Sequence, residues 1–152
     1  MIITFIGHSS LYNCKDLHTK IENAIIKNTT AEDYISFYCG GYGDFDNLCA
    51  SICRSIKEKM PRAEIVFITP YITEAQQKKL MYLIDNKLYD SIIYPPLEKV
   101  PAKFAICKRN EWMIDQSELI IAFVKRTHGG AFKALEYARK KKKVIINLAN
   151  TD

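Results

Sequence analysis

Two kinds of hydrophobic pattern alternate along the chain. Short runs rich in Ile, Val, Phe and Tyr are separated by longer segments in which apolar residues recur with helical spacing. The short runs predict strands at 2–6, 34–39, 64–69, 91–94, 118–124 and 143–148. The longer segments predict helices at 15–27, 45–59, 74–87, 102–117 and 130–141.

The predicted strands are apolar almost throughout, which is typical of a sheet covered by helices on both faces. Strands that alternate with helices favour parallel pairing and right-handed crossovers. We therefore expect an α/β fold, a three-layer Rossmann-like sandwich with a mainly parallel sheet of five to six strands, in a single domain over residues 1–152. Such sheets bind ligands beyond the carboxyl ends of their strands.

Composition narrows the expected ligands and location. The five cysteines include no C-x-x-C pair and the three histidines lie far apart, so we expect no metal site and no cofactor. Scattered thiols, a short N-terminal apolar run and the absence of a membrane-length apolar stretch favour a cytoplasmic protein without a membrane partner. The net charge of +5 includes the run "RKKKK" at 139–143, which we interpret as a solvated helix end. Nucleic acid is therefore a poor candidate for a partner.

Two glycine-containing loops follow predicted strands and differ in charge. The sequence "GGYGDFD" at 40–46 puts two acids at a helix start, with Asp44 the candidate N-cap and Asp46 in the first turn. The sequence "KRTHGG" at 125–130 puts cations before a helix that carries no acid until Glu136. Because free N–H groups at a helix start bind anions, we expect phosphate at the second loop and sugar or base at the first.

Recognisable motifs follow one another in order along the chain. They are "FIGHSS" at 5–10, "CGGYGDFDNLCA" at 39–50, "TPY" at 69–71, "RNEWMIDQSELIIAF" at 109–123 and "GGAFKALEYARKKKKVIINL" at 129–148. With these motifs the chain resembles, nearly end to end, the YpsA-like branch of the SLOG superfamily, whose distant relatives include the Lonely Guy phosphoribohydrolases and DprA. The resemblance implies a Rossmann-like nucleotide-binding fold, a small nucleotide or nucleotide derivative as ligand, and makes a homodimer plausible.

Two functions stay open. The first is binding or sensing of a nucleotide; the alternative, implied by the resemblance to the phosphoribohydrolases, is N-glycosidic hydrolysis with Arg109 and Glu136 as the catalytic pair. Phe132 and Lys133 stand where those enzymes carry Gly-Thr, so binding ranks ahead of catalysis. The candidate nucleotide-binding residues are Gly7, His8, Ser9, Gly40, Gly41, Gly43, Asp46, Tyr71, Arg109, Asn110, Thr127, Gly129, Gly130 and Ala131.

Several of these residues also have a purely structural interpretation. Glu136 has the spacing for an exposed helical ion pair with Lys140. His8 sits in a glycine turn where it can cap the local backbone, and Tyr71 can cover the end of the sheet without touching a ligand. Met113 is expected in the core.

Overall fold

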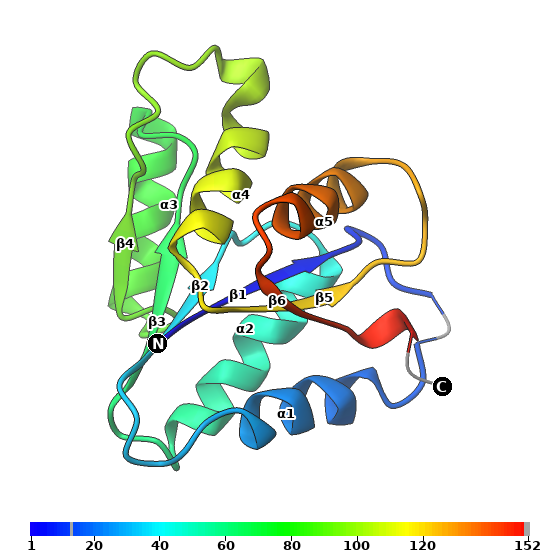
Figure 1. The fold of residues 1–152 in the computed structure, drawn as a ribbon. Helices are drawn as coiled ribbons and strands as arrows, with labels where there is room; N and C mark the ends of the chain where they lie inside the picture. The colour runs from blue at the N-terminus through cyan, green and yellow to red at the C-terminus, as the bar shows by residue number, and fades with distance from the viewer. Residues whose placement is uncertain (13, 151–152) are drawn as a thin grey trace.

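The six strands form one parallel sheet. In the computed structural model, which describes residues 1–12 and 14–150, the strands lie in the order β4-β3-β2-β1-β5-β6 (Figure 1). They are β1 (Ile2–Gly7), β2 (Ile35–Cys39), β3 (Ala63–Ile68), β4 (Ser91–Ile93), β5 (Leu119–Phe123) and β6 (Val144–Asn147). All five neighbouring pairs are parallel, which confirms the predicted sheet.

Five α-helices connect the strands close to the predicted positions. They are α1 (Leu17–Lys27), α2 (Asp44–Lys57), α3 (Glu74–Asp85), α4 (Ala105–Gln116) and α5 (Gly130–Lys140), with short 3-10 turns η1 (Ala102–Phe104) and η2 (Leu148–Asn150). The N-cap prediction for Asp44 is wrong, because Gly43 caps α2 without a side-chain bond. The Asp44 carboxylate instead accepts a hydrogen bond from the N–H of Leu11 at 3.1 Å.

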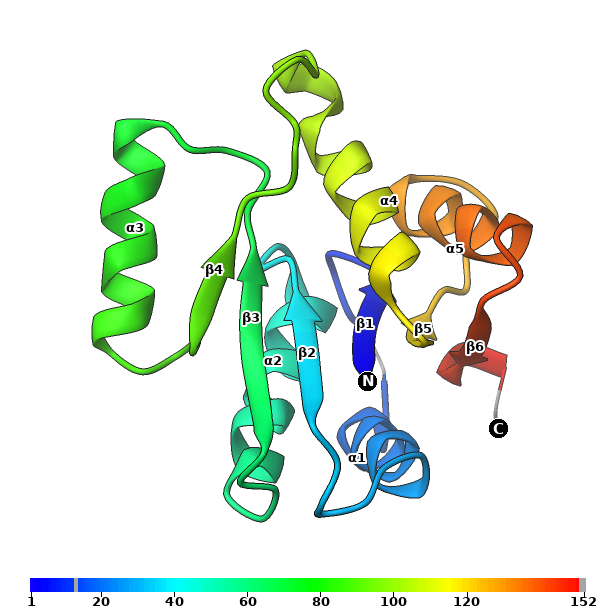
Figure 2. The ribbon, with the colours of Figure 1, turned by 60° about the vertical axis from the view of Figure 1, so that its left-hand side comes forward.

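The helices cover both faces of the sheet, as the apolar strands require. Buried residues of α1, α2 and α3 belong to one apolar cluster, whereas those of α4 and α5 pack on the opposite face (Figure 2). The chain moves outward from β1 to β4 and then returns through α4 to β5, which pairs with β1. Strand order therefore reverses between β1 and β5, where sheets of this kind bind ligands.

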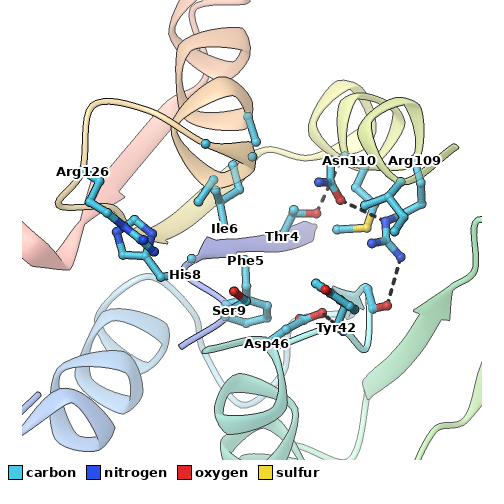
Figure 3. A pocket seen from close by; sticks show the side chains of 18 of the residues that line it. Thr4, Phe5, Ile6, His8, Ser9, Tyr42, Asp46, Arg109, Asn110 and Arg126 are labelled. Atoms are coloured by element: carbon cyan, nitrogen blue, oxygen red, sulfur yellow. Dashed lines mark hydrogen bonds between the residues drawn. The ribbon is translucent and has the colours of Figure 1, made fainter. Parts of the chain in front are cut away.

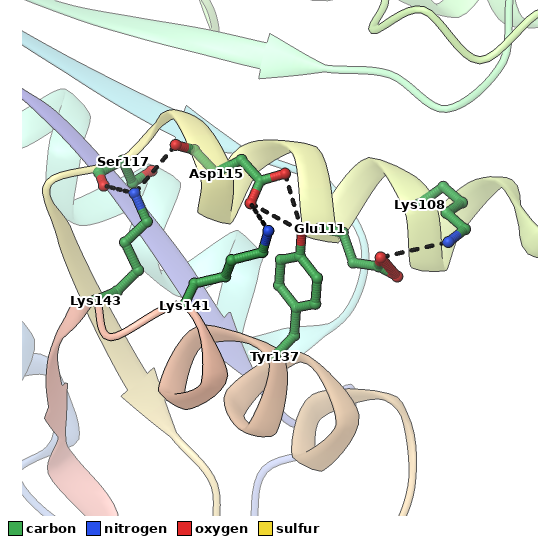
Figure 4. Close-up of polar contacts among 7 residues, drawn as sticks. All are labelled: Lys108, Glu111, Asp115, Ser117, Tyr137, Lys141 and Lys143. Carbon is green, nitrogen blue, oxygen red and sulfur yellow. Dashed lines mark hydrogen bonds and ion pairs between the residues drawn. The ribbon is translucent and has the colours of Figure 1, made fainter.

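Polar contacts tie the C-terminal ends of α4 and α5 together (Figure 4). The Tyr137 hydroxyl donates to a carboxylate oxygen of Asp115 at 2.8 Å, and Lys143 Nζ donates to the carbonyl oxygens of Asp115 and Ser117. Burial, with the Asp115 contact, raises the pKa of Tyr137 to about 12. These contacts fix the spacing of the two helices at the end remote from the strand-end loops.

Strand β5 is an interior strand of the sheet, and all five of its residues are buried. Ile121 is fully buried there, so Ile121→Ala is expected to lower the free energy of unfolding by about 2–5 kcal/mol in urea titrations. Val144→Ala, at a 63% exposed position of edge strand β6, is the control and should change it by no more than about 0.5 kcal/mol. Equal losses at both positions would contradict this account of the core.

Candidate functional site

A cleft opens at the point where strand order reverses. Its volume is about 340 Å³, its floor is β1, and it is bordered by α4, α5 and the loops that follow β1, β2 and β5 (Figure 3). Ten of the predicted site residues line it: Gly7, His8, Ser9, Gly40, Asp46, Arg109, Asn110, Gly129, Gly130 and Ala131. A cavity of this size lies within the range of small-ligand pockets.

The N-terminus of α5 is open to the cleft. Gly129 caps the helix with a φ of 92° and no side-chain bond, and the first turn contains no acid. The N–H groups of Gly130, Ala131 and Phe132 have no acceptor among the described residues. Arg126 and His128 line the same part of the cleft. Free amides, the helix dipole and a nearby cation are the features by which helix N-termini bind anions in proteins.

At the N-terminus of α2, backbone carbonyls of the loop after β1 accept hydrogen bonds from the first amides of the helix. The N–H of Asp44 donates to the carbonyl oxygen of Ser9 at 2.8 Å, and the N–H of Phe45 donates to that of His8 at 3.4 Å. Gly43 has a φ of 91°, and a Cβ there would lie 2.7 Å from the Cα of Ser9, so the loop requires glycine. Two of the first amides of this helix are therefore already occupied, and the first turn also carries the acids Asp44 and Asp46, which disfavours a phosphate there.

Asp46 reaches back from α2 into the loop that follows β2. Its Oδ2 accepts a hydrogen bond from the N–H of Tyr42 at 3.2 Å. Its Oδ1 is buried and, among the described residues, has no hydrogen-bond partner. Burial raises the pKa of the Asp46 carboxyl, and the charge of Arg109 and the loop amides oppose that shift. One carboxylate oxygen of a residue that lines the cleft is thus buried without a hydrogen-bond partner among the described residues.

Arg109 joins α4 to the ends of two strands. Its side chain is 3% exposed, and its Nη1 donates to the carbonyl oxygens of Gly40 and Ile68, both at 2.9 Å. Its Nε donates to Asn110 Oδ1 at 2.9 Å. A Cβ on Gly40 would lie 2.8 Å from the guanidinium carbon, so the absence of a side chain at Gly40 is what admits Arg109. Burial lowers the pKa of Arg109, and Asp46 counters that effect.

The His8 ring forms a hydrogen bond to the loop that follows β5. Its Nε2 accepts a hydrogen bond from the N–H of Lys125 at 2.9 Å, which requires the neutral ring with its proton on Nδ1. Burial lowers the pKa of His8, and the charges of Arg126, Lys125 and His128 lower it further. The neutral ring is therefore the form that holds the cationic loop in place.

Five predicted residues lie outside the cleft lining: Gly41, Gly43, Tyr71, Thr127 and Glu136. The Tyr71 hydroxyl donates to the Ala102 carbonyl oxygen at 3.3 Å, and Thr127 is exposed. Glu136 is half-exposed and forms an ion pair with Arg139 rather than with Lys140. Arg109 and Glu136 are therefore not brought together as a catalytic pair.

The lining also includes residues that sequence reasoning missed: Thr4, Phe5, Ile6, Tyr42, Ile106, Met113, Arg126, His128 and Ala134. The sequence could have pointed to three of these residues, because they lie inside the two glycine loops: Tyr42, Arg126 and His128. The residues of β1 and the apolar residues of α4 and α5 gave no such indication, since their pattern is that of ordinary core positions. In the described part of the chain, no three His, Cys, Asp or Glu side chains come together to hold a metal ion.

Comparisons with known proteins support the fold. DprA of Streptococcus pneumoniae superposes with a TM-score of 0.62 at 12% identity over 94% of this chain, which spans about half (48%) of the DprA chain. DprA of Helicobacter pylori gives 0.63 at 17% identity, with 95% and 63% of the two chains covered. TM1055 gives 0.61 at 13% identity, with 99% and 75% covered. The DprA-like, Rossmann-type fold implied by the SLOG resemblance is thus confirmed, while membership of the YpsA-like branch stays a prediction.

A sequence relative adds little about function. YoqJ, an uncharacterized protein derived from the SPbeta prophage of Bacillus subtilis strain 168, is 28% identical over 138 residues, covering 82% of this chain and 81% of its own. No family model matches the chain. Among the described residues, no helix has both the length and the apolar character needed to cross a membrane.

The expectation about nucleic acid needs correction. The sequence predicts no nucleic-acid partner, because "RKKKK" is its only dense basic run, but two structural neighbours are DNA processing proteins, and the H. pylori protein is described by its single-stranded DNA binding mode. The expectation is therefore wrong as stated, because it considered only dense runs of basic residues. The shorter pair Lys125 and Arg126 lies at the strand-end edge, where Arg126 lines the cleft and both line a neighbouring cavity.

The contact between His8 and Lys125 predicts a pH-dependent stability. Because the pKa of His8 is lowered by folding, the unfolded chain binds the proton first, and stability present above pH 6.5 is lost as the pH falls through the lowered value. The free energy of unfolding should fall less between pH 7 and pH 5 in His8→Gln, whose amide oxygen can accept the same bond. His18→Gln, at an exposed position of α1, serves as control. Equal slopes in His8→Gln and wild type would contradict the assignment.

Proposed function

Because the chain has the Rossmann-like fold of the DprA and TM1055 structures, we propose that it binds or senses a nucleotide or nucleotide derivative in the cleft between α4 and α5. The phosphate lies at the first turn of α5, and the sugar and base extend toward Asp46 and Arg109. One observation carries the proposal: a single cleft joins a bare helix N-terminus to a buried carboxylate oxygen without a partner.

The chemistry of the cleft suits the parts of a nucleotide. Free N–H groups and the cation Arg126 suit the phosphate, and the His128 side chain lines the same part of the cleft. The unpaired oxygen of Asp46 can accept a bond from a sugar hydroxyl or a base N–H. Tyr42 lines the cleft and is 67% exposed, so its ring is available for stacking on a base.

Binding fits the cleft better than hydrolysis does. Stabilising a cation-like sugar requires a carboxylate at the glycosidic bond, and Glu136 is paired with Arg139 outside the cleft. The Nη1 of Arg109 is occupied by two backbone carbonyls, which makes this residue a support of the site. We therefore favour a bound or sensed ligand over a hydrolysed one.

Gly130 provides the sharpest test of the phosphate position. A side chain there meets nothing within 4 Å, so Gly130→Asp should fold and place a carboxylate at the free amides. Wild-type protein with a 5′-mononucleotide near 100 times its Kd should gain about 2.7 kcal/mol of stability, and the aspartate variant should lose most of that gain. The readout is thermal unfolding with a panel of 5′-mononucleotides.

Two matched variants separate charge from shape in that experiment. Gly130→Asn has nearly the same size as the aspartate but no charge, and should retain more of the stabilisation. Glu136→Gln changes a charge on the same helix outside the cleft and should bind like wild type. Equal stabilisation of the wild type and of Gly130→Asp would contradict a phosphate at this turn.

Single-stranded nucleic acid is a second candidate, favoured by the likeness to H. pylori DprA. Arg126 and His8 line both the cleft and a second cavity of about 260 Å³, which Lys125 also lines. A strand longer than one nucleotide can therefore extend from one cavity to the other along Arg126 and Lys125. A labelled oligothymidylate should bind at low salt, weaken at high salt, and bind at least tenfold more weakly to Arg126→Glu. Absence of binding at low salt would remove this candidate.

A further inference from the structure

On the α4 side of the cleft, the polar side-chain groups that find no partner in residues 1–12 and 14–150 are hydrogen-bond donors of Arg109 and Asn110. Among the described residues, the Nη2 of Arg109 has no protein acceptor, whereas its Nη1 and Nε are fully used. The residue is buried, yet none of the ion pairs in the described part of the chain includes it. An amino group of a buried, unpaired guanidinium is thus left for a ligand.

Asn110 adds a second donor on the α4 side of the cleft. A guanidinium carries no acceptor, so the bond from Arg109 Nε fixes which end of the Asn110 amide is the oxygen. The NH₂ group must then point away from Arg109, on the side facing β1 (Figure 3). No described residue accepts a bond from this NH₂ group, and Asn110 lines the cleft.

The unpaired oxygen of Asp46 is the neighbouring acceptor. Asp46 and Arg109 line the same cleft and each affects the charge state of the other, but they do not form an ion pair. The site presents donors on the α4 side and an acceptor on the α2 side.

We propose that this arrangement selects a base with a lactam edge, in which a ring carbonyl lies beside a ring N–H. The carbonyl oxygen accepts from Asn110 and Arg109, and the N–H donates to Asp46. Hypoxanthine, guanine and uracil carry this edge, whereas adenine and cytosine present an amino group beside an unprotonated ring nitrogen. In those two bases donor faces donor and acceptor faces acceptor, which leaves buried groups unpaired. This inference rests on the proposed nucleotide site.

The test compares ligands that differ only at this edge. Isothermal titration should give Kd values at least tenfold lower for IMP than for AMP, and for UMP than for CMP. Asn110→Asp still accepts the bond from Arg109 but replaces the donor with an acceptor, so it should reduce the IMP-to-AMP preference at least fivefold. Glu111→Gln, one position along α4 and outside the cleft lining, should keep the wild-type ratio.

The outcomes separate this inference from the proposed function. Equal affinities for IMP and AMP, with both weakened by Gly130→Asp, would overturn the lactam selection and leave the nucleotide site standing. An unchanged ratio in Asn110→Asp would likewise overturn the role of Asn110. Failure of all four nucleotides to bind wild-type protein would overturn the nucleotide site itself, and the base selection with it. The wild-type comparison does not depend on the folding of any variant.

Discussion

The buried guanidinium of Arg109 is the interaction on which the cleft depends. It joins α4 to the carbonyl oxygens of Gly40 and Ile68, at the ends of β2 and β3, and it sets the orientation of Asn110. Removal of the guanidinium would leave two backbone carbonyls without their donor, at a cost of about 1–3 kcal/mol for each buried group. The same group therefore determines where the loop lies, how α4 is held, and which atoms remain for a ligand.

The N-termini of α2 and α5 differ because the loop that follows β1 makes different hydrogen bonds to each of them. The carbonyl oxygens of His8 and Ser9 accept bonds from the first amides of α2, while the His8 ring accepts from the N–H of Lys125 before α5. The loop after β1 thus occupies two amides at the start of α2, whereas at α5 it holds only the preceding loop and leaves the first amides of the helix free within the described chain. An anion is thus directed to α5 by hydrogen-bond satisfaction at α2 as much as by the nearby positive charge.

Periodicity was enough to predict the layers and to place the ends of every strand and α-helix within three residues, because each element buries a face that only a covered parallel sheet can accommodate. Sequence also identified both glycine loops and the candidates Arg109 and Asn110. It did not predict that Glu136 lies outside the cleft lining, because spacing along a helix does not say which side faces the neighbouring helix. It also missed Thr4 and Ile6, since a cleft that extends down the sheet between two helices is lined by residues with an ordinary core pattern.

The shared fold leaves the choice of ligand to the site, since one architecture can carry many functions. At the α5 end of the cleft, the first amides of the helix and Arg126 have no anionic partner among the described residues, and the neutral His8 ring holds the N–H of Lys125 in the same loop. At the other end Asp46 and Arg109 are desolvated without pairing. Each end of the cleft thus has polar groups without a described partner: the α5 end suits an anion, and the other end suits a neutral group with a donor and an acceptor. A ligand that is anionic at one end and carries adjacent acceptor and donor atoms at the other relieves both strains at once, which inorganic phosphate or a free base cannot do.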